Sequence, residues 1–267
     1  MNTGLTLKKV REHKTRPGHI TLWWLGQAGF LVKTPRGQVV VLDPYLTNSC
    51  KAIGDENGLD FDRQVPPPIA AEELAGVDVW LFTHSHQDHC DPETVTAARR
   101  AGGRGPYIAP AETVEKLVSL KVPPDETLMI WPNKTHTVGD LNVRATFAIP
   151  SSGDDLTHVG YLLTPKDGPT VYFTGDTTWH DLLAEAVAEH KPDVLVTVIN
   201  PAFRNLSPAE AALLARRLDV KAAIPCHYDL FADNCQPPQM LRTNLKIQGM
   251  VESYRLLRHG APFDWPE

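Results

Sequence analysis

The feature that most constrains this chain is a histidine-rich segment placed directly after an apolar run. Residues 83–89 read T-H-S-H-Q-D-H and follow the apolar residues 77–82. A short apolar run of this kind predicts a buried strand, so three imidazoles and a carboxylate would lie on the loop that leaves it. Neutral imidazoles and carboxylates are ligands for divalent ions of the Zn, Fe or Mn type. The segment therefore predicts a metal site at a strand end, the alternative being a solvated loop.

The size and composition of the chain fit one α/β domain. It has 267 residues, of which 42% are hydrophobic and 22% charged, with a net charge of -6. We expect residues 1–267 to form a single domain. Without a Lys/Arg-rich run or an apolar stretch of about 18–20 residues, neither nucleic acid nor a membrane is an expected partner. Residues 1–16 are polar and basic, unlike a signal peptide, so we expect a cytoplasmic protein. A small-molecule substrate and a homo-oligomeric assembly are further expectations.

The order of apolar runs and turn signals predicts a two-sheet architecture. Apolar runs separated by turn residues predict three antiparallel strands within residues 19–44. Asp91-Pro92 and Ser207-Pro208 each combine an N-cap residue with proline at the first helical position, which predicts two helix starts. Residues 47–68 indicate a long loop and residues 254–257 a closing strand. Because a β-rich stretch followed by β-α units occurs twice, we expect two facing sheets with helices outside.

Three further candidate ligands also come just after apolar runs. Asp43, Asp176 and His227 follow residues 38–42, 170–174 and 222–225. Ligands collect beyond the carboxyl ends of strands in α/β sheets. One edge of the protein would therefore gather four histidines and three aspartates, enough for two ions. Asp176 is the expected bridge because a carboxylate has two oxygens, and His227 completes the second site.

Spacing divides the histidine-rich segment between the two ions. His84 and His86 are two residues apart, so in an extended loop they point the same way and hold one ion. Asp88 and His89 follow on a turn and reach the second ion. We expect Asp43 to support a metal-bound imidazole through its other ring nitrogen, although an ordinary turn would also explain this aspartate.

The cysteines do not suggest a second metal site or disulfides. Cys50, Cys90, Cys226 and Cys235 form no C-x-x-C pair, and a chain of this size needs no disulfides. Cys90 and Cys226 are each adjacent to a proposed histidine ligand, but neighbouring side chains of an extended segment point apart. We expect buried neutral thiols at these positions.

The histidine-rich segment and the other segments with candidate ligands resemble the signature of the metallo-β-lactamase superfamily. Within it, the chain is most similar to the bacterial L-ascorbate-6-phosphate lactonases. The resemblance covers nearly the whole chain in order, through residues 22–26, 83–89, 106–110, 175–177, 224–229 and 263–266. It implies an α/β fold of the four-layer αβ/βα sandwich type, a hydrolase activity, and one or two divalent ions per chain. Manganese and zinc are the expected metals, with iron as a further option.

The chain departs from the superfamily pattern at one ligand. Most members carry a third histidine in the loop that here contains Ser151 and Ser152. The first site would then be completed by Asp154, Asp155 or His158, or stay empty. A single ion would in that case be held by Asp88, His89, Asp176 and His227. A locally hydrogen-bonded histidine at the start of a strand is the alternative for His158.

The ligands and the resemblance together predict a lactonase-like, metal-dependent hydrolase. A metal-bound hydroxide would open a lactone or related carboxylic ester, for example of a sugar phosphate or sugar acid. Asp88 is the expected catalytic residue, because a carboxylate beside the metal orients the water or takes its proton. Arg204, near a helix start, and Tyr228, beside His227, are candidate substrate contacts, and His158 is a candidate acid. An exposed loop arginine and a buried tyrosine are the alternatives.

Two other functions compete with this prediction. A phosphodiesterase or nuclease of the same fold needs complete two-metal sites, and Ser151, Ser152 and the lack of a basic surface count against it. A non-hydrolytic metal-binding or redox protein is the alternative of another class. Oxygen-reducing relatives generally carry a carboxylate in place of His86 and an added flavin domain. His86 and the short chain therefore argue against the redox alternative.

Overall fold

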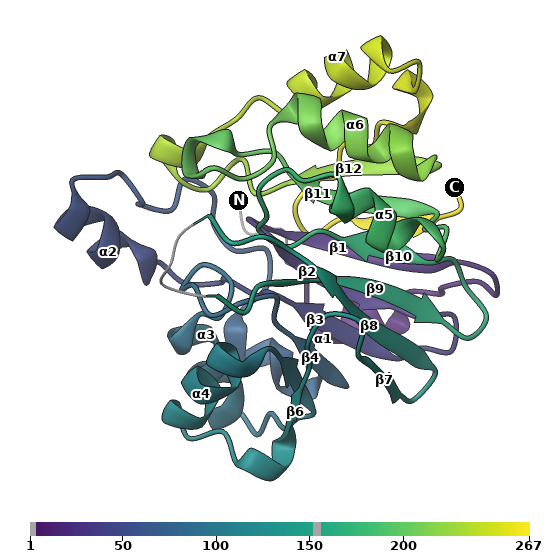
Figure 1. Cartoon of the computed structure of the whole chain (residues 1–267). Helices are drawn as coiled ribbons and strands as arrows, with labels where there is room; N and C mark the ends of the chain where they lie inside the picture. Colours follow the sequence, from purple (N-terminus) through teal and green to yellow (C-terminus); the bar gives the residue numbers. More distant parts are fainter. Residues whose placement is uncertain (1–3, 152–155) are drawn as a thin grey trace.

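Two β-sheets lie face to face, and helices cover the outer face of each sheet (Figure 1). The computed structural model of the chain describes residues 4–151 and 156–267. Within these ranges one sheet has seven strands and the other has six. The architecture is the four-layer αβ/βα sandwich that the sequence predicts.

Each sheet changes from antiparallel to parallel pairing along its width. In the first sheet β13 and β1 to β3 pair antiparallel, and β3 to β6 pair parallel. Its strands in spatial order are β13 (Pro262–Trp265), β1 (Ile20–Gly26), β2 (Gly29–Lys33), β3 (Val39–Leu42), β4 (Val79–Leu81), β5 (Tyr107–Ala109) and β6 (Thr127–Met129). The second sheet is antiparallel from β7 to β10 and parallel from β10 to β12. Its strands are β7 (Thr135–Val138), β8 (Leu141–Phe147), β9 (Val159–Pro165), β10 (Val171–Phe173), β11 (Val194–Val198) and β12 (Ala222–Cys226).

The helices form the two outer layers (Figure 1). On the first sheet lie α1 (Leu7–Glu12), α3 (Pro92–Arg100) and α4 (Ala111–Ser119), and on the second lie α5 (Leu182–Ala188), α6 (Pro208–Leu218) and α7 (Gln239–Ile247). Short 3-10 helices are η1 (Ala71–Gly76), η2 (Pro124–Glu126), η3 (Pro201–Phe203), η4 (Ala232–Asn234) and η5 (Val251–Ser253). Both predicted helix starts are confirmed, since Asp91 accepts a hydrogen bond from the Glu93 amide and Ser207 forms a capping box. Across the described ranges, no helix combines the length and apolar character needed to cross a bilayer.

Alternation along β1 shows why the strands are apolar on both faces. Ile20, Leu22 and Trp24 belong to the core between the two sheets, whereas Trp23 and Leu25 belong to the core under the helices. Successive side chains of a strand point to opposite faces, so a strand covered on both sides needs apolar residues at every position. The apolar runs of the sequence are therefore strands in the interior of the sandwich.

Two sequence-based predictions about elements are wrong. The segment 47–68 is not only loop, because it contains helix α2 (Cys50–Asn57), which extends from the body at one edge (Figure 1). Only Cys50 and Gly54 of α2 are buried, so the helix has too narrow an apolar face to stand out in the sequence. Residues 254–257 form one isolated bridge to β12 rather than a strand, and Leu257 is buried without strand pairing. The closing strand is β13, which pairs with β1.

Candidate metal centre

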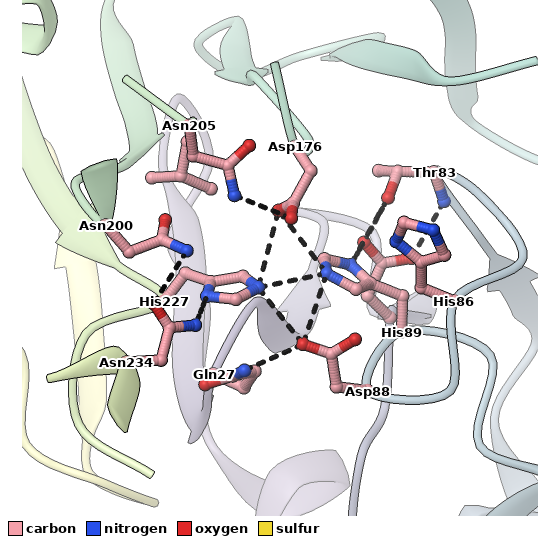
Figure 2. A network of polar contacts seen from close by, with 12 residues as sticks. Gln27, Thr83, His86, Asp88, His89, Asp176, Asn200, Asn205, His227 and Asn234 are labelled. Atoms are coloured by element: carbon pink, nitrogen blue, oxygen red, sulfur yellow. Dashed lines mark hydrogen bonds and ion pairs between the residues drawn. The ribbon is translucent and has the colours of Figure 1, made fainter. Parts of the chain in front are cut away.

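The predicted ligands lie together where strands from both sheets end (Figure 2). Asp43 directly follows β3, residues 84–89 follow β4, Asp176 follows β10, and His227 directly follows β12. Asp43 and His227 have φ values of 43° and 61°, and Gly175 has a φ of 60°. These left-handed positions turn the chain sharply at the strand ends, so that the side chains converge on one edge of the sandwich.

Four ligand atoms form a compact cluster (Figure 2). His89 Nε2 lies 3.1 Å from His227 Nε2, 3.3 Å from Asp176 Oδ1 and 3.8 Å from Asp88 Oδ2. His227 Nε2 lies 3.2 Å from Asp88 Oδ2 and 3.4 Å from Asp176 Oδ1. Atoms bound about 2.1 Å from a tetrahedral metal centre lie about 3.4 Å from one another. The observed separations fall around this value, so these residues fit a divalent ion.

Asp176 provides a second sign that the cluster binds a cation. Its Oδ2 accepts a hydrogen bond of 2.7 Å from the Asn205 amide. Its Oδ1 is buried and makes no hydrogen bond within the described ranges. A buried carboxylate oxygen without a donor is costly unless a cation satisfies it. Asp176 Oδ1 therefore points to a ligand role.

Three imidazoles form a second group beside this cluster. Ligand atoms of His84, His86 and His158 all lie within 4.8 Å of one another. His84 Nε2 lies 2.9 Å from His86 Nδ1, and the rings of His84 and His158 have centroids 3.9 Å apart. A further group of His84, His89 and Asp176 links the two clusters, where the sequence predicts a bridging carboxylate.

His158 thus lies beside His84 and His86, the two imidazoles that the sequence assigns to the first ion. Its Nδ1 is 3.2 Å from the backbone carbonyl oxygen of Asp176. Among the other candidates for this role, Asp154 and Asp155 lie outside the described residues, as does Ser152. Ser151 lines the adjacent cavity.

A buried hydrogen-bond network fixes the orientation of His89. Asp43 accepts hydrogen bonds from the Thr83 amide at 2.8 Å, from Thr83 Oγ1 at 2.5 Å and from His89 Nδ1 at 2.8 Å. Asp43, Thr83 and His89 are fully buried. With Nδ1 bonded to the carboxylate, the lone pair of the neutral imidazole is on Nε2, which faces the cluster. The structure therefore places Asp43 in the supporting position that the sequence predicts.

Three amide side chains around the cluster were missed by the sequence reasoning (Figure 2). Gln27 donates to Asp88 Oδ2 at 2.8 Å, Asn205 donates to Asp176, and Asn234 Nδ2 lies 3.3 Å from His227 Nδ1. Asn200 donates to Asn234 Oδ1 at 3.2 Å and extends this chain. Position offers a signal for Gln27 alone, because it directly follows the end of β1.

The electrostatics of the cluster favour a cation. Burial alone would raise the pKa of Asp88, but the adjacent His89 and His227 imidazoles hold it well below its ordinary value, and they do the same for Asp176. Burial would lower the pKa of His89 and His227, but the Asp176 and Asp88 carboxylates raise it above the ordinary value. Burial and the neighbouring imidazoles lower the pKa of His84, which keeps it neutral. Ionised carboxylates that attract protons to imidazoles attract a metal ion in the same way.

The two cysteines next to proposed ligands are buried thiols, as predicted. Burial raises the pKa of Cys90 to about 12 and raises that of Cys226 well above its ordinary value. A thiol must lose its proton to bind a metal. Neither residue belongs to the ligand groups found in the described part of the chain.

Comparison with known proteins identifies the family. The model of the family described as "Beta-lactamase superfamily domain" matches residues 40–228. A UPF0173 metal-dependent hydrolase from Anaeromyxobacter sp. (strain K) is 31% identical over 264 residues, which cover 94% of this chain and 89% of that protein. The chain belongs to the beta-lactamase superfamily of metal-dependent hydrolases. The groups of His and Asp residues described above are consistent with a metal-dependent member of this superfamily.

Two further relatives bear on the lactonase resemblance. A probable L-ascorbate-6-phosphate lactonase from Shigella boydii is 24% identical, over 97% of this chain and 82% of that protein. The solved structure of an isothiocyanate hydrolase from Delia radicum gut bacteria matches with a TM-score of 0.73 and 18% identity, over 91% of this chain and 98% of that one. The second match shows a shared fold. The predicted resemblance to the superfamily and to its lactonase relatives is confirmed.

A cavity of about 390 Å³ opens beside the ligands of this superfamily site. Asp88, Asp176, His86 and His227 line it from the ligand side. The remaining described lining residues are Cys50, Ile53, Phe61, Gln87, Ser151, Asn200, Phe203, Phe231 and Asn234. Its volume lies within the range of small-molecule sites.

The two other predicted substrate contacts lie outside this cavity lining. Arg204 is exposed at a left-handed position after η3, whereas its neighbour Asn205 turns inward to Asp176. Tyr228 is buried in the core, where its ring lies 5.0 Å from that of Trp24. Side-chain alternation after His227 points Tyr228 away from the ligands, as the alternative for this residue anticipated.

Proposed function

We propose that this protein hydrolyses a lactone or a related carboxylic ester at the Asp88, His89, Asp176 and His227 cluster. The observation that carries the proposal is that His89 Nε2 and His227 Nε2 lie 3.1 Å from each other and 3.2 to 3.8 Å from oxygens of Asp88 and Asp176, next to an open cavity. A divalent ion there would act as a Lewis acid on the carbonyl and lower the pKa of a coordinated water. The mixed imidazole and carboxylate set suits manganese, zinc or iron.

The side chains around the cluster orient the candidate ligands. Asp43 fixes His89 and Asn234 contacts His227, so both imidazoles direct Nε2 toward Asp88 and Asp176. Gln27 holds Asp88 by a hydrogen bond, and the lowered pKa of Asp88 keeps its carboxylate ionised. An ionised carboxylate on the cavity wall orients an attacking water and takes up its proton.

Lactone opening is a reaction that a small site of this kind can carry out without releasing a second product. Water adds to the acyl carbon, the ring C–O bond breaks, and the released alkoxide takes a proton to give a hydroxy acid. The leaving group stays attached to the product, so the site needs no separate exit for it. His86 lines the cavity together with Asp88 and Asp176, and His158 belongs to the same group of imidazoles, so both are candidates to deliver that proton.

The observed cavity lining favours carboxylic esters over phosphodiesters. Among its described residues, none is Lys or Arg. Enzymes that hold a phosphodiester need cationic groups against its phosphate oxygens. The three-imidazole group of His84, His86 and His158 differs from the carboxylate-containing pattern of the redox alternative.

The test is a metal analysis combined with a substrate screen. The protein is purified with its native metal, the ions per chain are measured, and lactones, phosphodiesters, β-lactams and isothiocyanates are assayed. Isothiocyanates are included because the fold relative named above hydrolyses them. We expect lactone hydrolysis that a chelator abolishes and that Asp88→Ala lowers at least about a hundredfold. Hydrolysis of phosphodiesters or isothiocyanates, with no hydrolysis of any lactone, would overturn the proposal.

A further inference from the structure

One wall of the cavity beside the ligands is apolar and aromatic. Cys50 and Ile53 come from α2, Phe61 from the segment after it, Phe203 from η3, and Phe231 from the segment after β12. Phe61 is central, because its ring centroid lies 5.7 Å from that of Phe203 and 5.0 Å from that of Phe231. Three segments far apart in the sequence therefore meet in one surface, which we call the aromatic wall.

The aromatic wall packs against the protein on one side and is partly exposed on the other. Phe231 is 2% exposed and packs on Tyr45, with ring centroids 5.7 Å apart. Phe61 is held by α2, since a Cβ added at Gly54 would lie 2.8 Å from the Cβ of Phe61. Ile53, by contrast, is 38% exposed, and Phe61 is only partly buried. Exposed apolar surface in a concave site gains stability when an apolar group covers it.

Charge around the cavity argues against an anionic substituent. The nearby Arg63 guanidinium donates to the backbone carbonyls of Tyr45 and Val65, which ties it to the loop. Arg204 is exposed and is not part of the described lining. The described lining offers the amides of Gln87, Asn200 and Asn234 but no Lys or Arg. A phosphate in this cavity would therefore lie beside carboxylates without a cationic side chain, whereas phosphate sites in proteins commonly use Arg or Lys.

We propose that the substrate carries an uncharged alkyl or aryl substituent that lies against the aromatic wall. The inference rests on the proposed function and narrows its substrate class. The ester-type carbonyl would lie beside Asp88, and the apolar group would cover Phe61, Phe203 and Ile53. This class replaces the sugar phosphate or sugar acid that the sequence leads us to expect.

A set of lactones with one common ring tests the substituent. γ-Butyrolactone is compared with derivatives that carry phenyl, hexyl, hydroxymethyl or phosphonooxymethyl groups on the γ carbon. We expect kcat/KM to be at least about tenfold higher for the phenyl and hexyl lactones than for the two polar ones. A phosphorylated lactone that is turned over best would overturn the inference.

Variants of the aromatic wall test the site of contact. Phe61→Ala and Phe203→Ala should each lower kcat/KM for the phenyl lactone about tenfold, while the unsubstituted ring changes by less than about twofold. Ile53→Lys should shift the preference toward the phosphorylated lactone. Phe263→Ala is the matched control, because Phe263 is also partly buried but lies on β13, outside the described lining. Equal losses on both substrates would mean that the phenylalanines only support the fold.

A binding measurement separates this inference from the proposed function. Calorimetry measures the affinity for γ-phenyl-γ-lactam, in which a ring N–H replaces the ring oxygen, and for its phosphonooxymethyl counterpart. Tighter binding of the phenyl lactam, weakened about tenfold by Phe61→Ala, supports the apolar class even if no lactone is hydrolysed. Tighter binding of the phosphorylated lactam, or no effect of Phe61→Ala, would refute it.

Discussion

Replacing Asp43 by asparagine tests how much the hydrogen bond to His89 contributes to metal binding, while His89 itself is unchanged. Asp43 is fully buried and accepts hydrogen bonds from the Thr83 amide, the Thr83 hydroxyl and His89 Nδ1, at 2.8, 2.5 and 2.8 Å. Asp43→Asn keeps the volume of the side chain but removes its charge and one acceptor oxygen. The amide nitrogen of asparagine must then face at least one of these donors. We therefore expect His89 to lose its fixed orientation.

The expected magnitude follows from two separate costs. Loss of a carboxylate that hydrogen-bonds a metal-ligating histidine lowers metal affinity about 10–100-fold, or about 1.4–2.7 kcal/mol. A buried donor left unpaired costs about 1–3 kcal/mol of folding free energy. Asp43→Asn should thus raise the metal Kd about 10–100-fold and destabilise the chelated protein by about 1–3 kcal/mol.

Two measurements distinguish these costs. Competition with a chromophoric chelator gives the metal Kd, and urea unfolding in excess chelator gives the free energy of unfolding. Asp264→Asn is the control, because Asp264 accepts hydrogen bonds from Thr21 and His13 at the start of β1, away from the ligands. It should change stability and leave the Kd unchanged. An unchanged Kd in folded Asp43→Asn, or an equal change in the control, would refute the reasoning.

Three further predictions concern protons, backbone and the second ion. Burial lowers the pKa of His89 and His227, but the surrounding carboxylates raise this pKa above 6.5. Protons therefore compete with the metal for the ligand nitrogens. Metal affinity should fall as pH decreases through these raised values, by up to about tenfold per pH unit for each proton displaced, measured as Kd against pH. Gly175→Ala should abolish metal binding, because Gly175 has a φ of 60° and an added Cβ would lie 2.5 Å from a backbone carbonyl of β9. Gly37→Ala, at φ 89° with no neighbour within 4 Å, should retain metal binding, with both variants measured by the same chelator competition. His86→Ala should remove only the weaker of two binding events in a metal titration. Loss of both events would contradict the prediction that His86 belongs to the weaker site.

Local rules account for the parts of the fold and site that the sequence predicts. Each ligand-bearing strand is covered on both faces, so its apolar run is readable, and the polar residue after it marks the carboxyl end. Asp91 and Ser207 are helix caps whose chemistry depends on residues within the first turn. The positions of the candidate ligands and the helix starts were therefore predictable without knowledge of the tertiary structure.

Residues whose role depends on distant contacts were not predictable in this way. Gln27 and Asn205 have polar side chains in loops. Gln27 and Asp88 follow different strands of the first sheet, and Asn205 and Asp176 follow different strands of the second, so the strand order within each sheet brings them together. Phe61 belongs to a segment that reads as loop, and its partners in the aromatic wall come from beyond residue 200. The charge of Arg204 made it a candidate substrate contact, but the left-handed turn there directs the neighbouring Asn205 inward instead.

The support around each ligand explains why the four-residue cluster should be the stronger site. Asp43 contacts His89, Asn234 contacts His227, Gln27 contacts Asp88, and Asn205 contacts Asp176. Two carboxylates among its ligands also neutralise the charge of a divalent ion. The neighbouring group of His84, His86 and His158 offers three imidazoles, and among the described residues Asp176 is the carboxylate that groups with His84. An ion there should bind after the first, since Asp176 is already oriented and charge-compensated by the stronger site.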